Sequence, residues 1–457
     1  MKSNLEMGPV NGYLKTSESE LASVEAYCER YKAFLSVSKT ERMTVASTLR
    51  LLEENGFTEF SGDSPLKAGD RIYFNNRGRS LLAAVIGSAG LKEGVNIVAS
   101  HVDSPRLDIR PVPLTEDTGA ALLKTHYYGW LRKYQWVSLP LMMTGVVYLA
   151  DGTRVDVSIG ENGDDPVLVI PDLLPHISKE QDKQLLSEAH TGEGMTILLA
   201  SIPLRDCDET KAVKCHALQI LNEKYGITEE DFISAELEVI PALPVRDVGI
   251  DRSLIGGYAQ DDKVCAYAAL EALLQMTCPK RTAVLLLADK EETGNLGISG
   301  ASSQTFDYFM DLMCRSQNVN RRDCYNKSFC MSGDVTSAYD PNYASAFSKE
   351  NAAKINGGIA LCKYTGFGCK EGCSDASAEL VSYTRRLFAK HGVIWQSAEM
   401  GRIDLGGGGT VALEFARRGI DTIDAGVAVL GMHSPFEVVS KLDCYMTYKA
   451  YKAVYEE

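Results

Sequence analysis

One stretch decides the fold of this 457-residue chain: Ala283-Val284-Leu285-Leu286-Leu287-Ala288-Asp289-Lys290-Glu291-Glu292-Thr293-Gly294. Six consecutive apolar residues lead directly into a charged turn. An apolar run without polar alternation is typical of a strand buried on both faces, as in a parallel sheet covered by helices. The paired glutamates indicate an ordinary solvated turn unless positive charge lies beside them, because two close carboxylates repel each other.

Three other apolar segments end in a similar way. His101 follows the run 95–100, Asp334 follows the run 329–333, and His433 follows the run 423–432. Asp261 opens a further apolar segment, which is expected to be a helix reaching about residue 276. In an open α/β sheet, residues beyond the carboxyl ends of the strands meet at one edge. We therefore expect these side chains to converge.

The converging residues form a plausible set of metal ligands. Two histidines and several carboxylates suit zinc, cobalt or manganese better than magnesium. Each residue also has an ordinary explanation by itself. A histidine after a strand is commonly a hydrogen-bonded loop residue, and Asp261 is also explained as a helix cap. The coincidence at several strand ends favours a metal site.

Composition and charge exclude several classes of function. With 47 basic and 61 acidic residues the net charge is −14, which argues against nucleic acid and anionic membrane partners. No apolar run approaches the roughly 18 residues that span a bilayer. Residues 1–6 lack the apolar core of an export signal, and the twelve cysteines form no C-x-x-C pair. We expect reduced thiols and a cytoplasmic location.

The length predicts two domains, because a chain of this size exceeds one ordinary core. We expect an α/β catalytic domain, with a mixed sheet flanked by helices, over residues 1–109 and 231–457. Residues 110–230 contain aromatic and β-branched runs separated by acidic, glycine-bearing turns, which predicts an inserted β-rich domain. Near the amino terminus we predict helices over residues 17–35 and 40–56 and a hairpin over residues 71–86.

Five motifs carry a resemblance to a known family. They are, in order, His101-Val-Asp103-Ser-Pro105, Asp261-Asp262, Glu291-Glu292-Thr-Gly294, Ser332-Gly-Asp334 and Met432-His433-Ser434. This pattern resembles the aspartyl aminopeptidase family of co-catalytic di-metal exopeptidases, in its bacterial type. The match covers essentially the whole chain, including the β-rich insertion.

The resemblance implies a role for each residue. One divalent ion would be held by His101, Asp261 and Asp334. The second, also most simply zinc, would be held by Asp261, Glu292 and His433, with Asp261 bridging. Glu291 would be the general base of a metalloaminopeptidase that acts on peptides, and Asp103 would orient His101. The spacing by itself does not decide which glutamate is the base and which is the ligand.

Two further features match the family more loosely. Gly406-Gly-Gly-Gly409 resembles a glycine-threonine loop near the substrate, with Gly408 and Gly409 as candidate substrate-binding residues; the alternative is a flexible turn. His176 matches a histidine that the family's inserted domain presents to a neighbouring subunit; the alternative is an ordinary loop histidine. The resemblance also implies that the insertion forms dimers and that dimers build a dodecamer.

One position departs from the family pattern. Eukaryotic members carry a lysine on a Gly-Pro-apolar-apolar-Lys strand, suited to an acidic substrate side chain, where this chain has Gly357-Gly358-Ile359-Ala360-Leu361. Lys363 lies two residues further on. The sequence therefore gives no support for an acidic preference. The alternatives are another di-metal amidohydrolase, such as a dipeptidase or deacylase, and a self-assembling metal-binding protein without turnover.

Overall fold

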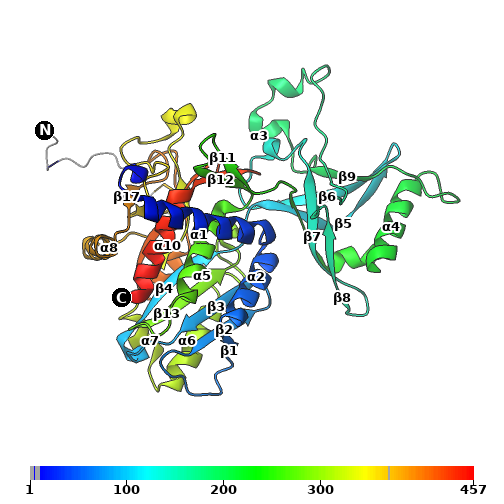
Figure 1. The fold of residues 1–457 in the computed structure, drawn as a ribbon. Helices are drawn as coiled ribbons and strands as arrows, with labels where there is room; N and C mark the ends of the chain where they lie inside the picture. Colours follow the sequence, from blue (N-terminus) through cyan, green and yellow to red (C-terminus); the bar gives the residue numbers. More distant parts are fainter. Residues whose placement is uncertain (1–4, 6–10, 369–370) are drawn as a thin grey trace. The chain divides into compact units, whose positions relative to one another are not determined.

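The computed structural model describes residue 5 and residues 11–368 and 371–457. Residues 1–4 and 6, which belong to the segment expected to lack an export signal, lie outside the described residues. The chain divides into two compact units (Figure 1). Unit 1 comprises Met1–Asp103, Val245–Met432 and Glu437–Glu457, and unit 2 comprises Ser104–Pro244 and His433–Phe436.

Unit 1 is built on a nine-stranded mixed sheet, which confirms the predicted α/β class. The strand order is β1-β2-β3-β13-β4-β14-β18-β16-β17. The deciding stretch forms β13 (Thr282–Ala288), which pairs parallel with β4 (Val95–His101) and antiparallel with β3 (Ser80–Val85). The other strands of this sheet are β1 (Thr58–Glu59), β2 (Arg71–Asn76), β14 (Phe329–Ser332), β16 (Ile359–Cys362), β17 (Trp395–Ala398) and β18 (Asp421–Gly426).

Helices cover both faces of this sheet, as the apolar run of β13 predicts. Leu285 and Leu287 belong to one hydrophobic cluster, and Val284 and Leu286 belong to another. The first cluster also contains side chains of α1 (Glu18–Val37), α2 (Glu41–Glu54), α5 (Gln260–Leu274), α8 (Ala378–Lys390) and α10 (Lys441–Glu456). The second contains side chains of α6 (Thr305–Ser316), α7 (Arg321–Tyr325) and α9 (Ala412–Ala416). Burial on both faces therefore excludes water from the whole strand.

The predicted amino-terminal elements are confirmed. The Ser17 hydroxyl accepts a hydrogen bond from Glu20 N at 3.2 Å and so caps α1, and Thr40 caps α2 in the same way. β2 and β3 form the predicted antiparallel hairpin. Unit 1 also holds a five-stranded sheet made of β11 (Arg246–Val248), β12 (Leu254–Gly257), β20 (Glu437–Ser440), β19 (Ala428–Leu430) and β15 (Thr336–Ser337).

Unit 2 is an antiparallel six-stranded sheet with one longer helix, α4 (Ala212–Tyr225). Its strands, in sheet order, are β8 (Arg154–Ile159), β7 (Leu141–Tyr148), β10 (Ala235–Pro241), β5 (Arg106–Asp117), β6 (Ala120–Tyr128) and β9 (Thr196–Ala200). A short helix, α3 (Leu186–Ala189), lies in the connection before β9.

The boundaries of unit 2 differ from the range 110–230 predicted for the insertion. The strand near residue 235, assigned from sequence to the catalytic domain, is β10, and it pairs with β5 and β7 at the centre of the unit 2 sheet. Because both neighbours of β10 belong to unit 2, this unit continues to residue 244. No helix in the described residues is long and apolar enough to cross a membrane.

A partly buried ionic cluster joins three elements of unit 1. The Asp247 carboxylate, on β11, lies 2.7 Å from Lys32 Nζ of α1 and 3.4 Å from Lys441 Nζ at the start of α10. Arg252 also contacts Asp247, and Lys441 contacts Glu25 at 2.7 Å. Burial would raise the pKa of Asp247, but the hydrogen bonds from Lys32 and Arg252 and the charge of Lys441 lower it to about 2.

We expect Asp247→Asn to destabilise the protein at pH 7 by about 2 kcal/mol, since the pKa of this carboxyl lies well below its unfolded value. An aspartate with a lowered folded pKa stabilises the fold above its unfolded pKa, near 4, and this stabilisation is lost as the pH falls towards 2. The difference in melting temperature between Asp247→Asn and the unchanged chain should therefore be smaller at pH 3 than at pH 7. The exposed Asp117→Asn is the control, and a difference that stays constant or widens at pH 3 would contradict the assignment.

Candidate metal centre

Three neighbouring strands of unit 1 deliver candidate ligands to one edge of the sheet. β4 ends at His101, the Glu291-Glu292 pair follows β13, and Asp334 follows β14. β4 lies between β13 and β14 and pairs parallel with both, with Ala288 opposite His101. The carboxyl ends of the three strands therefore meet, as the sequence predicts.

Asp261 reaches the same edge from the first turn of α5. Its backbone is not helical, and the peptide bond to Asp262 is cis. The Asp261 N–H donates to the Glu437 carboxylate at 3.1 Å. The sequence analysis assigned no role to Glu437, because it lies in β20, outside the five motifs.

The candidate ligands lie within coordination range of one another. His101 Nε2 is 3.0 Å from Asp261 Oδ1 and 3.8 Å from Asp334 Oδ1. Three overlapping groups each place their ligand atoms within 4.8 Å of one another. These groups are His101-Glu291-Asp334, His101-Asp261-Glu292 and Asp261-Asp262-Asp334, and together they are here called the ligand cluster.

Asp103 connects the histidine of the ligand cluster to both glutamates. Its Oδ1 accepts a hydrogen bond from Glu291 N and its Oδ2 one from Glu292 N, each at 3.1 Å. His101 Nδ1 lies 3.2 Å from the Asp103 carbonyl oxygen and 3.3 Å from its Oδ1. A proton on Nδ1 therefore points at Asp103, and Nε2 remains for a metal ion.

Asp262 is the member of the ligand cluster to which the sequence analysis gave no role. It is fully buried, and its carboxylate accepts hydrogen bonds from the Ser100 hydroxyl and from His101 N. The available signal was the adjacent Asp261-Asp262 pair, but acidic residues are also favoured in the first turn of a helix, so the pair by itself did not assign Asp262 a role. Asp262 holds the end of β4 in place beside Asp261.

Burial and mutual repulsion change the protonation of the ligand cluster. Burial, joined by the negative charges of Asp334 and Glu292, raises the pKa of Glu291 well above its ordinary range. For His101, burial alone would lower the pKa, but hydrogen bonds with Asp103, Asp261 and Asp334 raise it well above its ordinary value. Divalent ions therefore compete with protons for these groups, and metal affinity should fall as the pH falls.

The ligand cluster fits a divalent cation of the zinc type. It combines an imidazole nitrogen with several carboxylate oxygens at a buried strand edge, and such mixed donor sets suit zinc, cobalt and manganese. Carboxylates crowded in this way need positive charge or protons to offset their repulsion.

The two remaining predicted histidines belong to unit 2. His433 lies in the segment His433–Phe436, and its Nδ1 is 2.6 Å from the carbonyl oxygen of Trp130. His176 lies in an exposed turn. The part of each histidine in the site stays a prediction.

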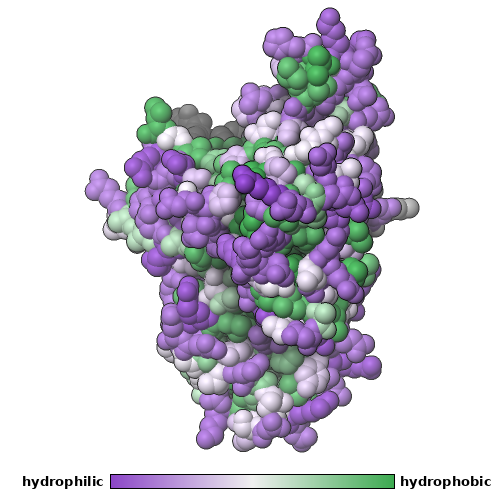
Figure 2. All heavy atoms as spheres, turned by 90° about the vertical axis from the view of Figure 1, so that its right-hand side faces the viewer, coloured by the Kyte–Doolittle hydropathy of each residue, from purple (hydrophilic) through white to green (hydrophobic). Residues whose placement is uncertain are grey.

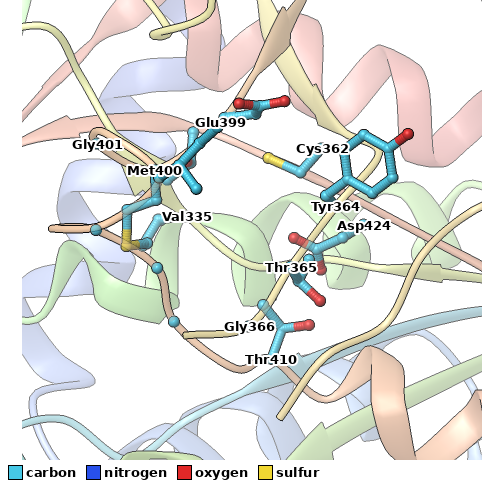
Figure 3. A pocket seen from close by; sticks show the side chains of 15 residues that line it. Val335, Cys362, Tyr364, Thr365, Gly366, Glu399, Met400, Gly401, Thr410 and Asp424 are labelled. Atoms are coloured by element: carbon cyan, nitrogen blue, oxygen red, sulfur yellow. The ribbon is translucent and has the colours of Figure 1, made fainter. Parts of the chain in front are cut away.

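Unit 1 contains a pocket, whose lining residues are shown in Figure 3. Val335, the neighbour of Asp334, lines it, and so does the predicted loop residue Gly408; Gly409 is not among its lining residues. Gly407 has a φ of +132°, and a Cβ there would meet the Gly366 oxygen at 2.3 Å. The glycine run is therefore required where two loops approach closely.

The position of the family's lysine is occupied by Leu361, and Lys363 lies two residues further on. Leu361 is buried in the first hydrophobic cluster, on the helix-covered face of β16. Lys363 follows the end of β16, and its Nζ lies 4.7 Å from the centre of the Tyr364 ring. Leu361 carries no charge, and Lys363 contacts the lining residue Tyr364 without lining the pocket itself.

Comparison with known proteins identifies the family. The family model described as aminopeptidase I zinc metalloprotease (M18) matches residues 34–455. A probable M18 family aminopeptidase 1 from Clostridium acetobutylicum is 44% identical over 451 residues, which cover 97% of each chain. The crystal structure of an M18 family aminopeptidase from Thermotoga maritima matches with a TM-score of 0.94 at 44% identity, covering 99% of this chain and 100% of that one.

A more distant likeness extends to yeast. The structure of the S. cerevisiae mApe1 dodecamer matches with a TM-score of 0.75 at 21% identity, covering 94% of this chain and 96% of that one, which shows a common fold. The family model and the bacterial relatives go further, because they match nearly the whole chain at high identity. They confirm the resemblance carried by the five motifs: the chain belongs to the M18 family of aminopeptidases, which are zinc metalloproteases.

Proposed function

We propose that this protein, a metalloaminopeptidase by family, removes the amino-terminal residue of peptides at the ligand cluster with the help of two divalent ions. The observation that carries this proposal is the convergence of His101, Asp261 and Asp334 with the Glu291-Glu292 pair in one compact group. A site that only binds metal and does not catalyse a reaction would not require Glu291 beside the metal ligands.

The ligands are divided between two ions in this proposal. His101, Asp261 and Asp334 hold one ion, and Asp261, Glu292 and His433 hold the other, so Asp261 is shared. Zinc is the expected metal, and cobalt or manganese would suit the same donors. Bound divalent ions lower the pKa of a water and polarise the carbonyl of the scissile bond.

Glu291 moves the proton in this reaction. It accepts a proton from the attacking water and delivers it to the nitrogen of the departing peptide, which would otherwise leave as a poor anion. Bound divalent ions would favour the ionised form of Glu291, which is the form that accepts a proton. The hydrogen bond from its own N–H to Asp103 fixes the turn that carries it.

Substituting each glutamate in turn tests whether Glu291 is the general base and Glu292 is a metal ligand. We expect Glu291→Gln to keep both ions yet lose hydrolysis by about 10²- to 10⁴-fold, the usual contribution of a general base. Glu292→Gln should lose metal as well as activity. Metal content and kcat/KM on aminoacyl substrates would be measured together, with the exposed Glu379→Gln as control. Full activity of Glu291→Gln, or metal loss confined to it, would remove Glu291 from this role.

Asp103 is expected to act as a positioning residue. Asp103→Asn keeps the shape but leaves only one carbonyl oxygen to accept from two N–H groups and weakens the partner of His101 Nδ1. The zinc dissociation constant, measured by competition with a chelating dye, should rise about 10- to 100-fold. Asp117→Asn, on the exposed end of β5, is the control. Unchanged zinc affinity together with unchanged kcat would show that Asp103 is dispensable.

We also propose that the protein acts as a cytoplasmic homo-oligomer, a dodecamer built from dimers through unit 2. Exposed apolar side chains support this, because unit 2 carries Trp130 at 78% and Val112 at 69% exposure. Figure 2 displays hydrophobic side chains at several places on the surface it views. Such side chains suit an interface between subunits.

Complementation tests whether His176 of one subunit acts in the active site of a neighbouring subunit. His176→Ala and Glu291→Gln should each be inactive, yet mixed oligomers of the two should recover about a quarter of the activity, because some sites combine an intact Glu291 with a neighbour's intact His176. Mixing would follow mild dissociation, with separately reassembled variants as controls. Mixed oligomers that stay inactive, or a fully active His176→Ala, would place His176 outside any neighbouring site.

A further inference from the structure

The pocket beside the ligand cluster lies where the first side chain of a substrate would fall. It has a volume of about 340 Å³, and its wall includes Val335, the residue after Asp334, and Thr410, whose hydroxyl is 3.4 Å from that of Ser332. Because Val335 directly follows Asp334, this wall begins about 3.8 Å along the chain, one Cα step, from the ligand cluster. The pocket is large enough for a long side chain.

The walls of the pocket are mainly apolar. Val335, Met400 and Ile403 are the aliphatic residues among the lining side chains. In Figure 3, Met400 and Val335 lie together on one side of the pocket, and Cys362 and Tyr364 lie on the other. Such walls suit the methylene stem of a long side chain.

The two ionisable groups that line the pocket with carboxyl side chains are Glu399 and Asp424. The described lining residues include no lysine, arginine or histidine. Arg402, between two lining residues, donates instead to the Ser345 oxygen at 3.1 Å. Asp424 is only 4% exposed and its Oδ1 is inaccessible, and burial together with the negative charge of Asp334 raises its pKa well above the ordinary range. Glu399 is therefore the group that presents negative charge to the pocket.

We propose that this pocket selects lysine and arginine as the amino-terminal residue of the substrate and rejects aspartate and glutamate. The proposal rests on the proposed aminopeptidase function and names its substrate class. The aliphatic stem of the substrate packs against Met400 and Ile403, and its cationic head approaches the Glu399 carboxylate.

Acidic and neutral side chains fit the pocket less well than basic side chains. An acidic side chain would place a second carboxylate beside Glu399, and the described lining residues include no cation to balance it. A neutral side chain such as leucine fills the apolar walls but makes no charge-assisted contact with Glu399. Leucine therefore ranks second and glutamate last.

The test is a substrate panel on the assembled, zinc-loaded protein. The kcat/KM values for arginyl, lysyl, leucyl and glutamyl substrates should fall in that class order, basic above neutral above acidic. Glu399→Gln should reduce the ratio of arginyl to leucyl kcat/KM by about 10-fold or more, the value of a charge-assisted contact. Asp404→Asn, an exposed acid of the same loop that does not line the pocket, should leave this ratio unchanged.

A reversed variant and a binding measurement complete the test. Glu399→Lys should raise the glutamyl to arginyl ratio, a gain that misfolding cannot imitate. Calorimetric titration with free arginine, leucine and glutamate should give the same order in the unchanged protein. Preference for glutamyl substrates, or arginine binding that is indifferent to Glu399→Gln, would overturn the proposal. Absence of hydrolysis on every substrate with arginine binding retained would overturn the proposed function alone.

Discussion

Repulsion between buried carboxylates is the constraint on which the structure of unit 1 depends. Asp261, Asp262, Glu291 and Asp334 crowd around one imidazole, with their ligand atoms in groups only 4.8 Å across. Water is largely excluded there, so screening is weak and the charges interact strongly. The raised pKa values of Glu291, Asp334 and His101 are the response of the protein itself, because added protons reduce the net negative charge. Bound divalent ions would also offset this negative charge, and they would in addition activate a water molecule for hydrolysis.

The fold positions this charge with rigid elements. β13, β4 and β14 are held in register by parallel pairing and by helices on both faces, so their carboxyl ends cannot separate without disrupting the core. Asp103 then links the separate ends, since one carboxylate accepts from the amides of Glu291 and Glu292 and faces His101. Placing the ligands on strand ends and their supports in adjoining turns keeps the geometry constant while the loops of the pocket define selectivity.

The sequence predicts the central part of this arrangement well. Mainly apolar runs predict β13, β4 and β14, and a histidine or carboxylate at the end of each strand, or within three residues after it, belongs to the ligand cluster. The end of the insertion was predicted at residue 230, whereas unit 2 continues to residue 244. The composition of β10 is compatible with either sheet, and only its strand pairing assigns it to unit 2. The bonds of Asp103 to two backbone amides depend on the turn at Lys290, which has a left-handed φ of 67°. Glu399 and Asp424 carry no local signal at all, because a pocket assembled from distant loops exists only in three dimensions.

The most direct test of the central claim is to locate the metal ions by anomalous diffraction from crystals of zinc-loaded protein. The account predicts two ions per chain, both of which would contact Asp261. His101 and Asp334 should coordinate one ion, and Glu292 and His433 the other. An empty ligand cluster in fully loaded crystals, or a single ion that Asp261 does not touch, would contradict it.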